Sequence, residues 1–200
     1  MPGGRDAGAL CRPKGPVQNI SLASVARYHH PHMSGDKISA ERWVGFEVKS
    51  GTVIIVQFLV PIDGPIDVEL DATWKLQTGP RHAAYHVMYE RIRGHLHERE
   101  IDRVAVMGSA VSGFPAKQVD LDAAELRGVV IAASAAVVPR VVTPTKGSLS
   151  RKSSRGKVDY YTEDDAYWKA MIKGGTLRKG SREVAYVVAS QARLRSEGAS

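Results

Sequence analysis

Cysteine is nearly absent from the sequence: the 200 residues contain one, Cys11. A single cysteine excludes an internal disulfide and fits a reducing compartment. Long apolar runs are also missing, since none reaches the roughly 18 residues that a membrane-spanning helix needs. The first residues, Met1–Asp6, have no apolar segment of a secretory signal behind them. We therefore expect a cytoplasmic protein with no membrane partner.

Basic residues outnumber acidic residues in this sequence. The chain has 21 Asp and Glu against 28 Lys and Arg, which gives a net charge of +7. A basic protein of this kind favours nucleic acid, or another polyanion, as its partner. The alternative is a basic surface with no such role, because net charge also governs solubility and non-specific binding.

The composition predicts one folded domain with a flexible arm before it. Hydrophobic residues make up 43% of the chain, which is enough for a core. Residues 1–40 contain Pro2, Pro13, Pro16 and Pro31 and show no sustained periodicity, so we expect a flexible N-terminal arm. We place the domain at residues 41–195 and a charged tail at 196–200.

The most informative stretch runs from Val44 to Val60. Two apolar segments, Val44–Lys49 and Thr52–Val60, predict two strands of a hairpin joined at Ser50-Gly51, where the glycine would supply a positive φ. Glu47 interrupts the first strand. A bare buried carboxylate costs several kcal/mol, so Glu47 needs a cation, a metal ion or an open cleft beside it. A structural ion pair with an arginine such as Arg127 or Arg182 is the alternative to a functional role.

The rest of the chain alternates strand and helix patterns. Apolar residues at every second position of Ile66–Leu76 predict a third strand with Asp67, Glu69 and Asp71 on one face. Further patterns follow in order: a helix at Arg81–Glu98, a strand at Ile101–Met107, a helix from about Val119, a strand at Pro139–Pro144 and C-terminal helices. This order predicts an α/β fold whose mixed sheet has three antiparallel strands, then parallel strands, with helices at its flanks.

A basic segment follows the last strand. Residues 145–157 contain no acid and five cations: Lys146, Arg151, Lys152, Arg155 and Lys157. Cations on a loop can neutralise phosphates and release counterions, so we predict a nucleic-acid-binding loop. The alternative is a solvated linker.

Three local features, taken in order, carry a resemblance to a known family. They are the strand Val44–Lys49 with its acid, the helix Glu125–Ala133 with its Arg-Gly pair, and Pro144–Lys157 running into Tyr160–Thr162. Together they resemble the RuvC-type Holliday-junction resolvases of the ribonuclease H-like superfamily, of which the chain would be a divergent member. The resemblance covers roughly residues 43–192. It implies a ribonuclease H-like fold, a DNA partner and a homodimer or larger assembly.

The resemblance also implies a metal site. In that family, carboxylates from the first strand, the end of the fourth strand and the last helix hold two divalent cations, Mg²⁺ or Mn²⁺. Glu47 matches the first position and Glu183 is the acid available at the last, so these two are the candidate catalytic and metal-binding residues. The fourth-strand position has Met107-Gly108-Ser109 and no acid. Substitutes could come from the next helix, in Asp120, Asp122 or Glu125.

Two functions are therefore open. The first is a nucleic-acid-binding or assembly subunit with a degenerate metal site and no cofactor. The second is an active divalent-metal-dependent endonuclease that cleaves DNA phosphodiesters. Under the second, Glu47→Gln abolishes cleavage and leaves DNA binding intact.

Overall fold

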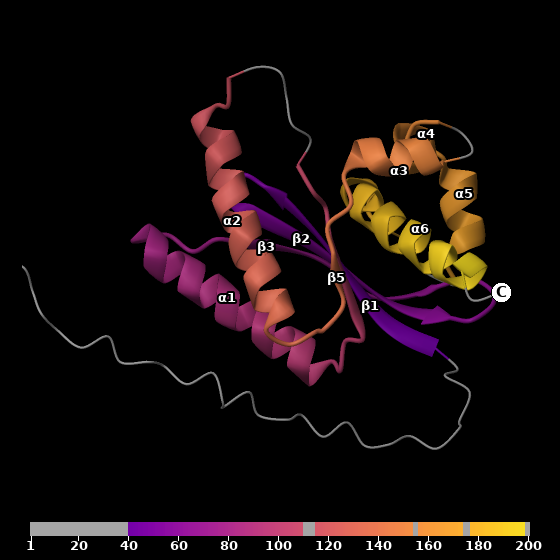
Figure 1. Ribbon diagram of the computed structural model, residues 1–200, viewed down its shortest axis with the longest axis horizontal. Coiled ribbons are helices and arrows are strands. Elements are labelled where there is room, and N and C mark those ends of the chain that lie inside the picture. The colour runs from indigo at the N-terminus through magenta and orange to yellow at the C-terminus, as the bar shows by residue number, and fades with distance from the viewer. Residues whose placement is uncertain (1–39, 110–114, 154–155, 174–176, 199–200) are drawn as a thin grey trace, which may run out of the picture. The chain divides into compact units, whose positions relative to one another are not determined.

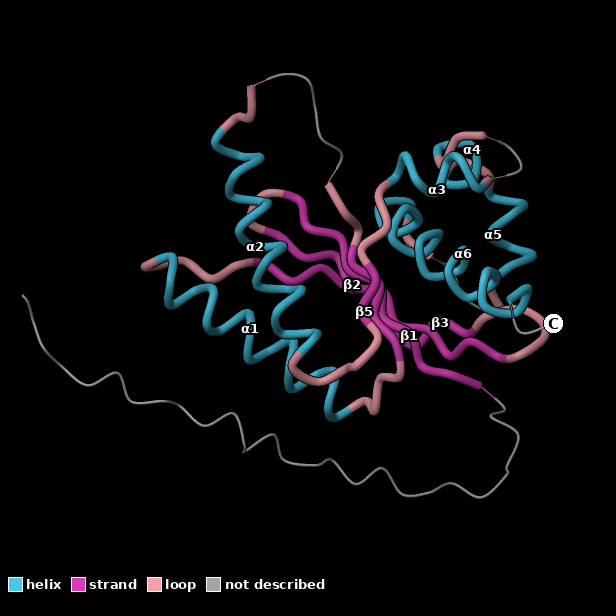
Figure 2. The backbone as a smooth tube through the Cα atoms, viewed as in Figure 1, coloured by secondary structure: helices cyan, strands magenta, loops and turns pink. Residues whose placement is uncertain are grey.

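The computed structural model describes residues 40–109, 115–153, 156–173 and 177–198. The predicted arm therefore lies almost wholly outside the described residues. A mixed sheet of order β3-β2-β1-β4-β5 forms the centre (Figures 1 and 2). Its strands are β1 (Ala40–Lys49), β2 (Thr52–Pro61), β3 (Asp67–Lys75), β4 (Arg103–Val106) and β5 (Val141–Val142).

Strand directions agree with the predicted fold class. β1 pairs antiparallel with β2, and β2 pairs antiparallel with β3. β4 lies parallel to β1, and β5 lies parallel to β4. The prediction of three antiparallel strands followed by parallel strands is confirmed.

Helices cover both faces of the sheet (Figure 1). One face carries α1 (Arg81–Glu98) and α2 (Gln118–Ala135). The other carries α6 (Arg182–Gly198), accompanied by α3 (Lys146–Lys152), α4 (Asp159–Thr162), α5 (Asp165–Met171) and the 3₁₀ turn η1 (Lys179–Ser181). Among the described helices, none is both long enough and apolar enough to span a bilayer.

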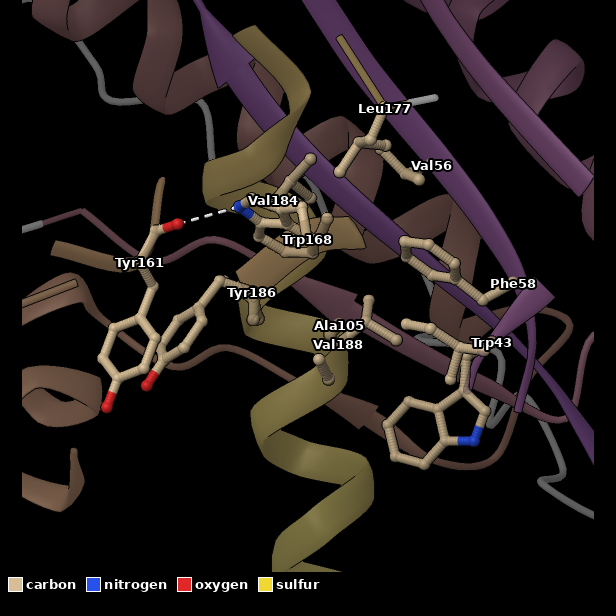
Figure 3. Close-up of a cluster of buried hydrophobic side chains, with 14 of the residues drawn as sticks. Trp43, Val56, Phe58, Ala105, Tyr161, Trp168, Leu177, Val184, Tyr186 and Val188 are labelled. Carbon is tan, nitrogen blue, oxygen red and sulfur yellow. Dashed lines mark hydrogen bonds between the residues drawn. The ribbon is translucent and has the colours of Figure 1, made fainter. Parts of the chain in front are cut away.

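Alternation along β1 creates two hydrophobic cores. Val44, Phe46 and Val48 point toward α1 and α2. Trp43 points the other way, into a second core that α6 completes. Figure 3 shows this second core, with Trp43 and Phe58 of the sheet near Val188 of α6. Because side chains alternate along a strand, Gly45 and Glu47 share the α6 side with Trp43.

Gly45 lets α6 lie directly on β1. A Cβ atom added at Gly45 would stand 2.8 Å from Cγ2 of both Val184 and Val188, closer than packed carbon atoms come. The missing side chain therefore fixes the distance between β1 and the first turns of α6. The same contact sets the start of α6, with Glu183, against the end of β1, with Glu47.

Two local predictions on the strands are wrong. At the hairpin, Ser50 takes the positive φ, of 53°, and Gly51 does not. In β3, a register shift opposite Gln57 and Phe58 reverses the alternation. Val68 joins the α6-side core while Leu70 packs with the other core, so the acids of β3 do not share one face.

Candidate functional site

Glu47 is a buried carboxylate at the end of β1. Its exposed fraction is 6%, and its Oε1 lies 2.8 Å from Nζ of Lys49. Oε2 is buried and has no hydrogen-bond partner among the described residues. Burial raises the pKa of Glu47, the Lys49 ammonium opposes that rise, and the negative charge of Glu183 adds to it. The structure thus brings the two predicted acids, from β1 and α6, into electrostatic contact.

Lys146 stands among the acids of this region. Its Nζ lies 2.6 Å from Oδ1 of Asp159 and 3.3 Å from Oε1 of Glu183. The hydrogen bond to Asp159, opposed by burial and reinforced by Glu183, raises the pKa of Lys146 and keeps it charged. Its positive charge also lowers the pKa of Glu47. One ammonium group therefore pairs with both Glu183 and Asp159.

At the end of β4, where the resemblance implies an acid, the structure places the guanidinium of Arg127 from α2. The β4 chain continues into Gly108, whose amide donates to the Pro144 carbonyl at 2.8 Å, and Ser109 follows. A nitrogen of Arg127, from α2, donates to the Ser109 hydroxyl. Burial lowers the pKa of Arg127, the Glu47 charge opposes this, and Nε of Arg127 is buried with no partner among the described residues.

The arginines considered as partners of Glu47 have different roles. Arg127 is near enough to feel the charge of Glu47. Arg182 points elsewhere: its Nη2 lies 2.5 Å from Oδ1 of Asp165 and its Nη1 donates to the Thr162 carbonyl at 3.1 Å. The predicted pairing with Arg182 is therefore wrong, because residue 182 faces α4 and α5, not the end of β1.

The acids considered as substitutes are used between α1 and α2. Asp122 and Glu125 contact Arg81 of α1, at 2.6 and 3.0 Å. Asp120 accepts a hydrogen bond from the Lys117 amide at 3.0 Å and caps the start of α2. The contacts of Asp122 and Glu125 hold the two helices together and that of Asp120 caps α2, so all three carboxylates have structural roles.

These residues do not fit a pair of divalent cations. Mg²⁺ asks for near-octahedral oxygen ligation, and two ions need several anionic ligands. Here Glu47 pairs with Lys49 and Glu183 pairs with Lys146, and Arg127 of α2, not a carboxylate, contacts Ser109 after β4. Within the described ranges, no group of three or more His, Cys, Asp or Glu side chains is arranged to hold a metal ion.

The basic segment is partly a helix, not the predicted loop. Thr145 caps α3, since its hydroxyl accepts from the Ser148 amide at 3.1 Å, and Leu149 is buried in the α6-side core. Arg151, Lys152 and Lys157 are exposed, and no carboxylate of the described residues pairs with them. Arg155 lies outside the described residues.

Solved structures with the same fold were found, although no protein-family model matches the chain and no curated protein matches it significantly by sequence. RuvC from Thermus thermophilus superposes with a TM-score of 0.57 at 14% identity, covering 78% of this chain and 97% of that one. The yeast mitochondrial Holliday junction resolvase Ydc2 gives 0.54 at 12% identity, covering 76% and 78%. The chain has the RuvC-type, ribonuclease H-like fold.

A further RuvC-type structure shows the fold with a nucleic acid. T. thermophilus RuvC in complex with a Holliday junction substrate matches with a TM-score of 0.54 at 13% identity, covering 77% of this chain and 96% of that one. At such low identity the likeness establishes the fold, and the activity of this chain has to be argued from its own residues.

Sequence reasoning missed three contacts of the site: that of Glu47 with Lys49, that of Arg127 with Ser109, and that of Lys146 with its two carboxylates. Lys49 lies two residues after Glu47, so strand alternation alone could have paired them. Arg127 was considered, but its contact with Ser109 was not. The carboxylates that hold Lys146 come from α4 and α6, far along the chain, and no local pattern links them to it.

Proposed function

We propose that this RuvC-type protein binds DNA through its basic segment and that its metal site is degenerate, so that it serves as a binding or assembly subunit. Arg151, Lys152 and Lys157, with Arg155 beside them in the sequence, neutralise phosphates. Lys146 positions the segment. The protein works in the cytoplasm, as a homodimer or within a larger assembly.

One contrast carries the proposal. Arg151, Lys152 and Lys157 are exposed and have no carboxylate partner among the described residues, so their charges are available to a polyanion. Lys146, at the start of the same segment, forms ion pairs with Asp159 and Glu183. Cations therefore outweigh acids on the exposed segment, while Asp159 and Glu183 are both paired with Lys146. Such a surface attracts phosphates without needing a metal ion.

The direct experiment measures DNA binding and DNA cleavage in the same samples. Because a RuvC has been solved with a Holliday junction, a labelled four-way junction is the first probe, with duplex and single-stranded DNA beside it. We expect binding that is equal in EDTA and in Mg²⁺ or Mn²⁺, with the DNA left intact. Binding that needs a divalent ion would refute the proposal.

The alternative is an active divalent-metal-dependent endonuclease. One observation favours it: Glu47 and Glu183, the two acids that the resemblance selects, do interact. That enzyme would have to displace Lys146 and Lys49 from these carboxylates. Cleavage in Mn²⁺ that Glu47→Gln abolishes, with junction binding unchanged, would establish the alternative.

A further inference from the structure

The position of Lys146 in its own helix is unfavourable for a positive charge. It is the first residue of α3. The N-terminus of a helix carries a partial positive charge and stabilises acids, not cations. Asp159 and Glu183 occupy the first turns of α4 and α6. The contacts of Lys146 with these two acids therefore join the first turns of three helices, and they offset the local repulsion.

The carboxylates of Glu183 and Asp159 need a cation between them, and that cation could be a lysine or a metal ion. Without Lys146, the carboxylates of Glu183 and Asp159 would face each other uncompensated, with the buried Glu47 close enough to interact with Glu183. Carboxylates that share one cation repel each other once that cation is removed. Mg²⁺ is commonly bound through one or two carboxylates, with waters and substrate phosphates at its other positions.

We infer that the Lys146 ammonium is the resident cation of the carboxylate pair formed by Glu183 and Asp159, standing where a divalent ion would otherwise bind. Because this cation is a side chain of the protein, it also has a structural effect. It holds the first residue of the basic helix α3 against α6, so the acids anchor the DNA-contacting segment. This inference deepens the proposed function and rests on it only for the role of the segment.

The test is a thermal unfolding series with Mn²⁺ and no DNA. Lys146→Met removes the charge and keeps the chain length, and Lys146→Arg is the matched control that keeps a cation. We expect about 10 mM Mn²⁺ to raise the Tm of Lys146→Met by about 3–6 °C, which corresponds to a site with a Kd near 1 mM. Wild type and Lys146→Arg should not respond, and Lys146→Met/Glu183→Gln should lose the response.

Two results would overturn the inference. One is a folded Lys146→Met protein whose Tm is indifferent to Mn²⁺. The other is a wild-type protein stabilised by Mn²⁺, with the effect lost in Glu183→Gln, because the ion would then displace the lysine.

A measurement on wild type covers the case in which Lys146→Met does not fold. Acetic anhydride acylates uncharged amines, so peptide mass spectrometry should show Lys146 reacting more slowly than Lys173, whose side chain is 70% exposed. We expect Mn²⁺ to leave the Lys146 rate unchanged. Faster labelling of Lys146 in Mn²⁺ would show that the ion releases it and would overturn the inference. DNA is absent throughout, so a failure of DNA binding leaves these outcomes untouched.

Discussion

Gly45 of β1 and Val184 of α6 are in such close contact that a Cβ on Gly45 would lie 2.8 Å from Cγ2 of Val184. This contact sets Glu183, the residue before Val184, near Glu47, two residues beyond Gly45. The pairing of acids that defines the candidate site is thus a result of how tightly a helix packs on a strand.

Gly45→Ala tests that packing. The added methyl group must push α6 away, and overpacking of this kind costs about 1–3 kcal/mol. Gly128→Ala is the matched control: it lies within α2 with no atom near its would-be Cβ, so helix propensity should stabilise it by about 0.5–1 kcal/mol. Urea unfolding measures both. Equal stability of Gly45→Ala and wild type would mean that α6 does not rest on this glycine.

Glu47→Gln should stabilise the fold at neutral and alkaline pH. Burial raises the pKa of Glu47 despite Lys49, so the folded protein holds this proton more tightly than the unfolded chain does. Wild-type stability therefore falls as pH rises from the ordinary carboxyl pKa through the raised value. The gain from the neutral amide should shrink as the pH falls below that range, where Glu47 is protonated in both states.

Thermal unfolding across pH 4–8, a range that spans about the ordinary carboxyl pKa and neutrality, measures this effect. Glu90→Gln, exposed on α1, removes the same charge from the surface and is the control. A Glu47→Gln protein less stable than wild type at pH 8 would show that the contact with Lys49 outweighs burial.

Asp71→Asn should weaken the attachment of η1, the turn that leads into α6, to β3. Asp71 accepts hydrogen bonds from the amide and guanidinium of Arg178, the latter at 2.6 Å, and from the Ser181 hydroxyl at 2.5 Å. Losing hydrogen bonds to a charged group costs about 1.5–3 kcal/mol. Asp67→Asn, whose contact with Lys173 is 4.0 Å long, should cost far less.

The same site predicts a pH dependence of opposite sign to that of Glu47. Burial alone would raise the pKa of Asp71, but the hydrogen bonds from Arg178 and Ser181 outweigh it and lower the pKa. Its contribution is present above the ordinary carboxyl pKa and is lost as the pH falls through the lowered value. Denaturant titrations should show the Asp71→Asn penalty at pH 7 shrinking in acid. A penalty that grows in acid would contradict this assignment.

The sequence predicted the fold better than the site. Val44–Val60 carries its strands in local apolar patterns, and the order of patterns along the chain predicts the mixed sheet. The register shift in β3, opposite Gln57 and Phe58, has no such signature, so the faces of β3 were misassigned. α3 was predicted as a loop because its cap pairs Thr145 with Ser148, not with the glutamate or glutamine of a typical capping box.

The site depends on contacts between distant segments. Glu47 could be singled out because a carboxylate in an apolar strand requires a partner. The neighbours that decide its chemistry, Glu183 and Lys146, are brought to it only by the packing of α6 and α3. A local sequence pattern identifies an unusual residue, but only tertiary packing tells whether a metal ion or a lysine neutralises it.

The most direct test of the central claim is the salt dependence of junction-DNA binding in EDTA. Wild type is compared with Arg151→Gln/Lys152→Gln/Lys157→Gln and with Arg93→Gln/Arg99→Gln/Arg140→Gln, which removes equal charge elsewhere. If the basic segment contacts phosphates, the slope of log K against log salt should fall by about 0.9 for each segment cation lost, and the control should keep the wild-type slope. An unchanged slope in the segment variant, or an equal fall in both, would contradict the account.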